Sequence, residues 1–174
     1  MPKKARSMKK RREIFDDFDA IELSAAAYLR DRWKEPYYHI EKADQGYLVQ
    51  YRLGRGWGAE DIEIPFSIAL EGDDAPRLRS ALNKLPAYQW TKEFHPKDVM
   101  VCDGYYWEMN FRKGDDYFQA YGDNAAPREL IDFYEYIVSL GLPRLDELDE
   151  IADSDLEATD ESPFDILKEM NDGR

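Results

Sequence analysis

The amino-acid sequence predicts an α+β domain in which a mostly antiparallel sheet, made of two meanders, is packed by helices on one face. Two groups of strand-like segments, over 37–70 and 99–121, alternate apolar with polar residues and contain turn residues at intervals. Two amphipathic helices, over 74–85 and 127–140, begin and end at strong capping signals. The 174 residues are enough for one domain with a substantial core.

The N-terminal part of the chain divides into a basic run and an apolar stretch. Residues 1–12 are rich in Lys and Arg without apolar periodicity, which predicts a flexible, disordered basic arm. Residues 13–33 predict one helix, or two helices broken near Ser24, that ends before Pro36. The apolar residues that give this stretch its roughly helical spacing are Ile14, Phe18, Ile21, Ala25, Tyr28 and Trp33.

The first group of strands has a clear turn and an unusual proline. Segments 37–42 and 46–53 read as two strands joined at Asp44 and Gly46, residue types that supply turn conformations. Segment 61–70 keeps strict alternation across Pro65. Because proline in a sheet is confined to edge positions or bulges, this segment is predicted to be a kinked edge strand.

The remaining elements of the domain are marked by caps and turns. Asp73 and Asp74 predict the start of the helix that ends near residue 85. The second meander is predicted over 99–121, with turns at 103–104 and 113–115. The last helix is predicted to open near Asn124 and Pro127 and to stop at Gly141.

The C-terminal part changes character after Pro143. Residues 146–174 carry twelve acidic and two basic side chains. Ser162 followed by Asp165 matches a capping box, so a short amphipathic helix is predicted near 162–170. The predicted organisation is therefore a basic arm over 1–12, a single α+β domain over 13–143, and an acidic tail over 144–174.

The block from Asp103 to Leu140 resembles uncharacterised small bacterial α+β domains. The residues that carry the resemblance are a turn, a strand tryptophan and a helix-opening motif: Asp103, Gly104, Trp107, Gly122, Asn124 and Pro127. The resemblance covers about a quarter of the chain, and its motifs are structural. It implies a fold and brings no catalytic residue with it.

Charge and composition limit the partners that the sequence favours. The net charge is −13, and the part between the +6 of residues 1–13 and the −10 of residues 146–174 is itself acidic. An acidic body repels phosphates, so nucleic acid is predicted to bind only through the basic arm, at Lys9, Lys10, Arg11 and Arg12. The single Cys102, and the lack of a long apolar segment or secretory signal, predict a cytoplasmic protein that does not contact membranes.

Few residues suggest catalysis, and none suggests a cofactor. His95 lies in a loop-like stretch, and a hydrolase using it with Asp98, Asp103 or Cys102 is one alternative. His39 and His95 are far apart in sequence and lack the spacing of a zinc motif, so no metal site is predicted. We assign no catalytic residue from the sequence and expect no cofactor.

The leading functional prediction is therefore binding to another protein, as an immunity protein, an inhibitor or an adaptor would do. Tyr, Trp and Arg dominate the hot spots of protein interfaces, and this chain has 12 Tyr and 4 Trp. An acidic amphipathic helix can also dock into a groove of a partner. The candidate binding residues are Arg55, Trp57, Tyr106, Phe164, Leu167 and Met170.

Overall fold

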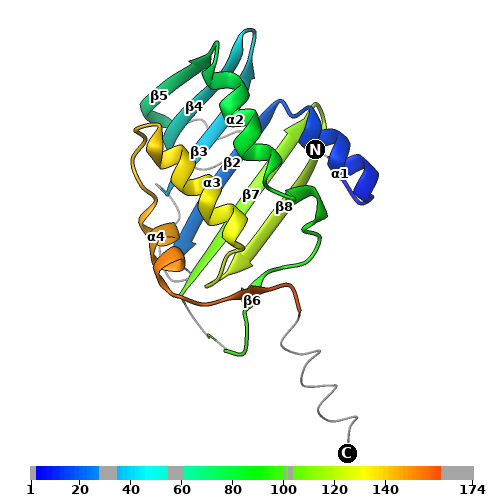
Figure 1. Cartoon of the computed structure of the whole chain (residues 1–174), viewed down its shortest axis with the longest axis vertical. Coiled ribbons are helices and arrows are strands. Elements are labelled where there is room, and N and C mark those ends of the chain that lie inside the picture. The colour runs from blue at the N-terminus through cyan, green and yellow to red at the C-terminus, as the bar shows by residue number, and fades with distance from the viewer. Residues whose placement is uncertain (1–2, 28–34, 55–60, 100, 102–103, 162–174) are drawn as a thin grey trace, which may run out of the picture.

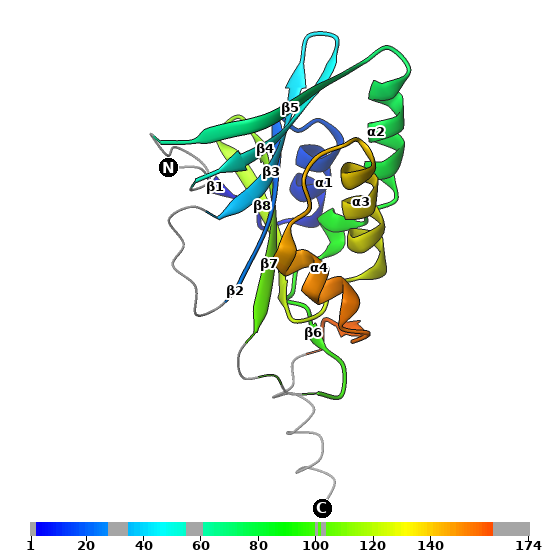
Figure 2. The same ribbon diagram turned by 90° about the vertical axis from the view of Figure 1, so that its left-hand side faces the viewer.

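A seven-stranded sheet with helices on one face forms the protein, which is described by a computed structural model. The described residues are 3–27, 35–54, 61–99, 101 and 104–161. The strands follow the order β1-β8-β7-β2-β3-β4-β5 (Figure 1). Figure 2 shows α1, α2, α3 and α4 on the same side of this sheet. The predicted α+β class with a mostly antiparallel sheet is confirmed.

The described elements form two sheets, four α-helices and a 3-10 turn. The large sheet contains β1 (Lys3–Lys4), β2 (Ala20–Ala27), β3 (Pro36–Ala43), β4 (Gly46–Leu53), β5 (Glu63–Glu71), β7 (Tyr105–Lys113) and β8 (Asp116–Asp123). A second sheet pairs β6 (His95–Pro96) with β9 (Ala158–Thr159). The helices are α1 (Met8–Asp16), α2 (Asp74–Asn83), a 3-10 turn (Ala87–Gln89), α3 (Arg128–Ser139) and α4 (Asp146–Asp153).

Two antiparallel units make the large sheet. β2, β3, β4 and β5 form a meander, and β7 and β8 form a hairpin that joins it through β2. The meander predicted over 37–70 therefore has one more strand than expected, β2. The meander predicted over 99–121 is a hairpin in the part that the structure describes. β1 adds to β8 in parallel. The hydrophobic core lies between the sheet and the helices, and its largest fully buried side chains include Trp107, Tyr38, Tyr134, Phe111, Phe118, Ile21 and Leu23.

The helix predicted over residues 13–33 ends at residue 16 and is wrong over 17–27, whereas residues 28–33 lie outside the described residues. Residues 20–27 form β2, which pairs with β3 on one side and β7 on the other. Six of its eight residues are buried, including Glu22. A strand buried on both faces loses the alternation that marks a half-exposed strand, and its alanines fit a helical pattern equally well.

The disordered basic arm is not what the structure describes for residues 3–12. Ser7 caps α1 by accepting a hydrogen bond from the backbone N–H of Lys10 at 3.2 Å. Arg11 is 4% exposed and donates to the carbonyl oxygens of Tyr88 at 2.8 Å and Trp90 at 2.6 Å. Burial lowers the pKa of Arg11. The basic run therefore contains one side chain that is part of the folded core.

The first part of the predicted acidic tail is folded against the domain. Residues 146–153 form α4, whose Leu148 and Ile151 are buried against the core. The hydroxyl of Tyr134 in α3 donates to Asp149 at 2.7 Å and accepts from the backbone N–H of Leu145 at 2.9 Å. The predicted short helix near 162–170 lies outside the described residues. None of the described helices has the length and apolar character needed to cross a membrane.

Candidate functional site

The outer edge of β8 is closed by backbone and side-chain donors. The backbone N–H groups of Lys3 and Ala5 donate to Asp115 and Tyr117 at 2.7 and 2.6 Å. Arg11 reaches the carbonyl of Gln119 at 3.4 Å. Further along, Phe94 donates to Tyr121 at 3.0 Å and accepts from Asp123 at 2.9 Å. Each of these contacts occupies a group that a further strand would need, so this edge is protected.

The strand at the opposite edge, β5, has nine residues, and no described strand lies on its outer side. β4 is the only strand that pairs with it in the part of the chain that the structure describes. Its Ile64 and Phe66 side chains are 46% and 49% exposed, among the most exposed large apolar residues described. Phe66 contacts Tyr51 of β4 edge to face, with ring centroids 6.2 Å apart. An exposed edge strand with apolar side chains is a template for pairing with another chain.

The backbone groups that β5 turns outward follow from the pairing register. Asp44 and Gln45 form a two-residue turn between β3 and β4, so Ala43 and Gly46 exchange hydrogen bonds with each other. Successive residues of a strand direct their backbone N–H and C=O groups to opposite neighbours. The residues of β5 that bond to β4 are therefore those such as Ile68. Ser67 and Ala69 therefore present their N–H and C=O groups to the outside. Pro65 lies two residues before Ser67, so its backbone nitrogen also faces outward. An edge strand tolerates a missing N–H at such a position.

The two ends of β5 are acidic. Glu63 and Glu71 begin and end the strand, and both are exposed. The interior between them carries no charged residue. A partner segment with basic residues flanking an apolar centre would match this charge distribution.

The sheet face opposite the helices carries paired polar side chains. His39 Nδ1 lies 3.1 Å from Glu22 Oε1, and both side chains are 6% exposed. Arg52 donates to the side-chain oxygen of Gln50 from Nε at 2.8 Å. Burial raises the pKa of Tyr37, with the nearby charge of Glu22 acting in the same direction. The described residues of β2, β3 and β4 on this face therefore form a network of paired polar side chains.

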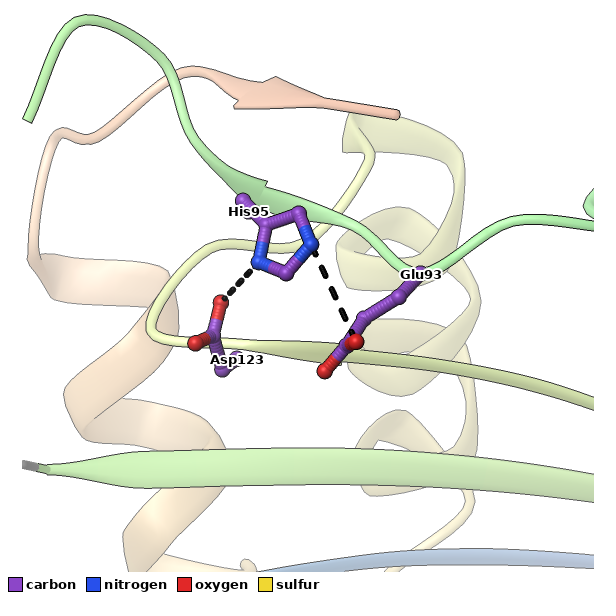
Figure 3. Close-up of side chains that lie close together, drawn as sticks. All are labelled: Glu93, His95 and Asp123. Carbon is purple, nitrogen blue, oxygen red and sulfur yellow. Dashed lines mark hydrogen bonds and ion pairs between the residues drawn. The ribbon is translucent and has the colours of Figure 1, made fainter. Parts of the chain in front are cut away.

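Three side chains at the protected edge form the one group of possible metal ligands found among the described residues. Oxygen and nitrogen atoms of Glu93, His95 and Asp123 lie within 4.8 Å of one another. His95 Nδ1 is 3.0 Å from Asp123 Oδ1, and His95 Nε2 is 3.8 Å from Glu93 Oε2 (Figure 3). His95 and Asp123 are each 19% exposed, and Glu93 is 41% exposed.

The backbone places these three side chains together. Phe94 is buried against Trp90 and Trp107, so in this extended stretch its neighbours Glu93 and His95 point to the other side. Phe94 bridges to Gly122, next to Asp123 at the end of β8. A Cβ on Gly122 would stand 2.7 Å from the Cβ of Phe94, so the close approach requires glycine.

The partners of His95 differ from those predicted, where the structure describes them. Asp98 is exposed in a turn with φ of 60°, and the residues that contact the imidazole are Asp123 and Glu93. Asp103 and Cys102 lie outside the described residues. No local signal in the sequence points to Asp123, because it joins His95 through pairing between residues 28 positions apart.

The predicted binding residues are only partly described. Tyr106 in β7 is half-buried and lines a cavity of about 190 Å³ with Glu93 and Glu108. The other candidates lie outside the described residues: Arg55, Trp57, Phe164, Leu167 and Met170. No prediction from the sequence assigned a binding role to β5, although its alternation and Pro65 had marked it as an edge.

The four basic residues predicted to bind nucleic acid have different surroundings. Arg11 is buried and bonded to carbonyl oxygens, so its guanidinium does not face solvent. Lys10 pairs with Asp116 at 2.8 Å. Arg12 lies 3.6 Å from Asp16, and Lys9 is exposed. The basic run is therefore not a free cluster of cations.

The resemblance noted in the sequence corresponds to structural roles. Trp107 donates from Nε1 to the carbonyl of Ala125 at 2.8 Å, and Asn124 accepts from the backbone N–H of Tyr105 at 2.9 Å. Asn124 adopts φ of 50°, which turns the chain from β8 toward α3. Comparison with family models, curated proteins and solved structures found no match to this chain.

Proposed function

We propose that this protein works by binding another protein, and that the outer edge of β5 is its recognition element. The observation that carries the proposal is an open edge strand whose Ile64 and Phe66 are about half exposed. An extended segment of the partner would add a strand there, with backbone hydrogen bonds to Ser67 and Ala69. Immunity proteins, inhibitors and adaptors all need such a partner-binding surface.

Charge favours a different protein over a second copy of this chain. Two β5 strands paired antiparallel about Ser67 would set Glu63 of one copy against Glu71 of the other. Like charges directly opposite each other destabilise strand pairing. We therefore expect a partner strand with apolar residues at alternate positions and Lys or Arg at its ends.

The test combines selection of ligands with two variants of β5. A displayed library of extended peptides is selected against the full chain, and the enriched peptides are measured on Ser67→Pro and Phe66→Asp. Ser67→Pro removes an outward N–H while the bonds to β4 remain, and Phe66→Asp places a charge on the exposed apolar patch. Each variant should weaken binding at least tenfold, with Met8→Asp as the control at a 45% exposed apolar residue on α1.

Amide hydrogen exchange locates the bound segment independently. Bound peptide should slow exchange at Ser67 and Ala69 and leave β8 unchanged, because the outer groups of β8 are already bonded. Selected peptides that bind the wild type and both β5 variants equally, or a library that yields no basic, alternating ligand, would contradict the proposal.

A further inference from the structure

We propose that Glu93, His95 and Asp123 form a binding site for a zinc ion. In this site His95 Nε2 and the Glu93 carboxylate bind the ion, and Asp123 accepts the Nδ1–H of His95. Zinc sites commonly hold the second ring nitrogen of a histidine by such a carboxylate, which fixes the tautomer and the ring orientation. The 3.0 Å distance between His95 Nδ1 and Asp123 Oδ1 is that of a hydrogen bond.

The distance on the other side of the ring fits a shared ion. His95 Nε2 and Glu93 Oε2 are 3.8 Å apart, too far for a hydrogen bond. Two ligands at zinc–ligand distances of about 2.0–2.1 Å in a tetrahedral site stand about 3.3 Å apart. Glu93 is 41% exposed, so a small movement of its side chain closes the difference.

The charge of the cluster favours a cation. Among the described residues, the ion-pair partner of both Glu93 and Asp123 is His95, and neither carboxylate pairs with Lys or Arg. Glu108 lines the adjacent cavity and adds a further carboxylate to that wall. A divalent ion would therefore neutralise a site that the protein leaves negative.

The ligand types favour zinc over magnesium and calcium. Imidazole is a preferred ligand of zinc, whereas magnesium and calcium take oxygen ligands. Glu93 is 41% and His95 is 19% exposed, so water reaches the remaining coordination positions of an ion bound between them. An ion held by two protein side chains and water would bind reversibly and stay accessible to a small ligand.

His39 supplies an internal comparison for this site. Its Nδ1 faces Glu22 at 3.1 Å and its Nε2 faces Glu41 at 3.7 Å, nearly the same distances as at His95. The His39 side chain is 6% exposed, and its two carboxylates were not found to converge as those around His95 do. His39 therefore serves as an internal control: its carboxylate distances resemble those of His95, but zinc is not expected to bind there.

The experiment titrates zinc into the full chain and follows the imidazole nitrogens by NMR. The chain has 2 His, so each ring can be assigned. Magnesium in excess occupies the many other carboxylates without competing for imidazole. Zinc should shift the Nε2 resonance of His95 while Nδ1 keeps its proton, and the resonances of His39 should not move.

Variants measured by calorimetry complete the test. Glu93→Gln should weaken zinc binding at least tenfold, and Asp123→Asn by about 10–100-fold, as loss of an outer-shell carboxylate typically does. Glu41→Gln, the matched change beside His39, should leave the affinity unchanged. Glu93 is partly exposed, so its replacement tests the site even if Asp123→Asn does not fold. Zinc that moves the His39 ring, or that binds Glu93→Gln as tightly as wild type, would overturn the proposal.

Discussion

The outer side of β8, where only the short strand β1 lies beyond it, differs from the outer side of β5 at the other end of the seven-stranded sheet. At β8, the backbone of Lys3, Ala5 and Phe94 and the side chain of Arg11 occupy the outward groups. At β5, Ser67 and Ala69 are exposed, and no described strand lies beyond them. Several separate contacts cover the outer backbone groups of β8, and no comparable contact among the described residues covers those of β5. This contrast supports the proposed role of the β5 edge in recognition.

The strongest test of this contrast removes one phenylalanine from each edge. Phe118 in β8 is fully buried, stacked on Phe111 at 4.6 Å, and covered by Arg11 at 4.4 Å from the ring centre. Phe118→Ala should lower the free energy of unfolding by about 3–5 kcal/mol. Phe66→Ala, at a 49% exposed ring, should lower it by less than about 1 kcal/mol.

Denaturant unfolding of both variants measures the difference. Equal losses would show that Phe66 is part of the core and that the β5 edge is covered in solution. A small loss at Phe66 together with weakened peptide binding by Phe66→Asp would assign the ring to recognition.

The sequence predicts the exposed edge better than the protected one, for a physical reason. Alternation over 61–70 and the position of Pro65 are local signals, and they identified β5 as an edge strand. α3 was equally predictable, because Pro127 and Gly141 mark its ends. Closure of the β8 edge depends on contacts between distant residues such as Arg11 and Gln119. No local pattern contains that information.

The same distinction applies to the candidate sites. The sequence singles out His95 but favours its neighbours along the chain as partners, whereas the fold supplies Asp123. The sequence does not predict β2, because Ala20–Ala27 is mostly buried on both faces, which removes the alternation of a surface strand. Arg11 reads as a solvent-exposed cation in the basic run, although its bonds to Tyr88 and Trp90 make it part of the interior.

A second test asks whether charge keeps the β5 edge from pairing with itself. Glu71→Lys would place an ammonium group opposite Glu63 of a second copy, so two repulsive contacts per dimer become attractive. Each cross-strand pair contributes about 0.2–1 kcal/mol, so dimerisation should strengthen by roughly tenfold. Sedimentation velocity over a range of concentrations measures the effect.

Glu129→Lys on α3 makes the same change of charge away from either edge and serves as the control. If Glu129→Lys promotes dimerisation as strongly, the lower net charge is responsible and the argument from the ends of β5 fails. If neither variant associates, the partner strand must supply more than complementary charge.

The smallest effect is expected from exposed charges that belong to neither edge. Asp17, between α1 and β2, pairs with Lys113 at 2.8 Å and with Lys42, and these two contacts lower its pKa from 3.8 to about 2. A carboxyl whose pKa is lower in the folded state stabilises the fold above its unfolded pKa. That contribution is lost as the pH falls from about 4 to about 2.

Asp17 is half-exposed, so solvent screening limits its contribution to less than about 1 kcal/mol. Asp17→Asn should therefore cost at most that amount at about pH 7 and almost nothing near pH 2, measured by denaturant unfolding at both values. Raising the salt concentration should reduce the cost at neutral pH. Asp132→Asn, which breaks one exposed pair with Arg128, is the control. A cost for Asp17→Asn that persists in acid would mean that packing of the side chain, and not its charge, joins the ends of β3 and β7.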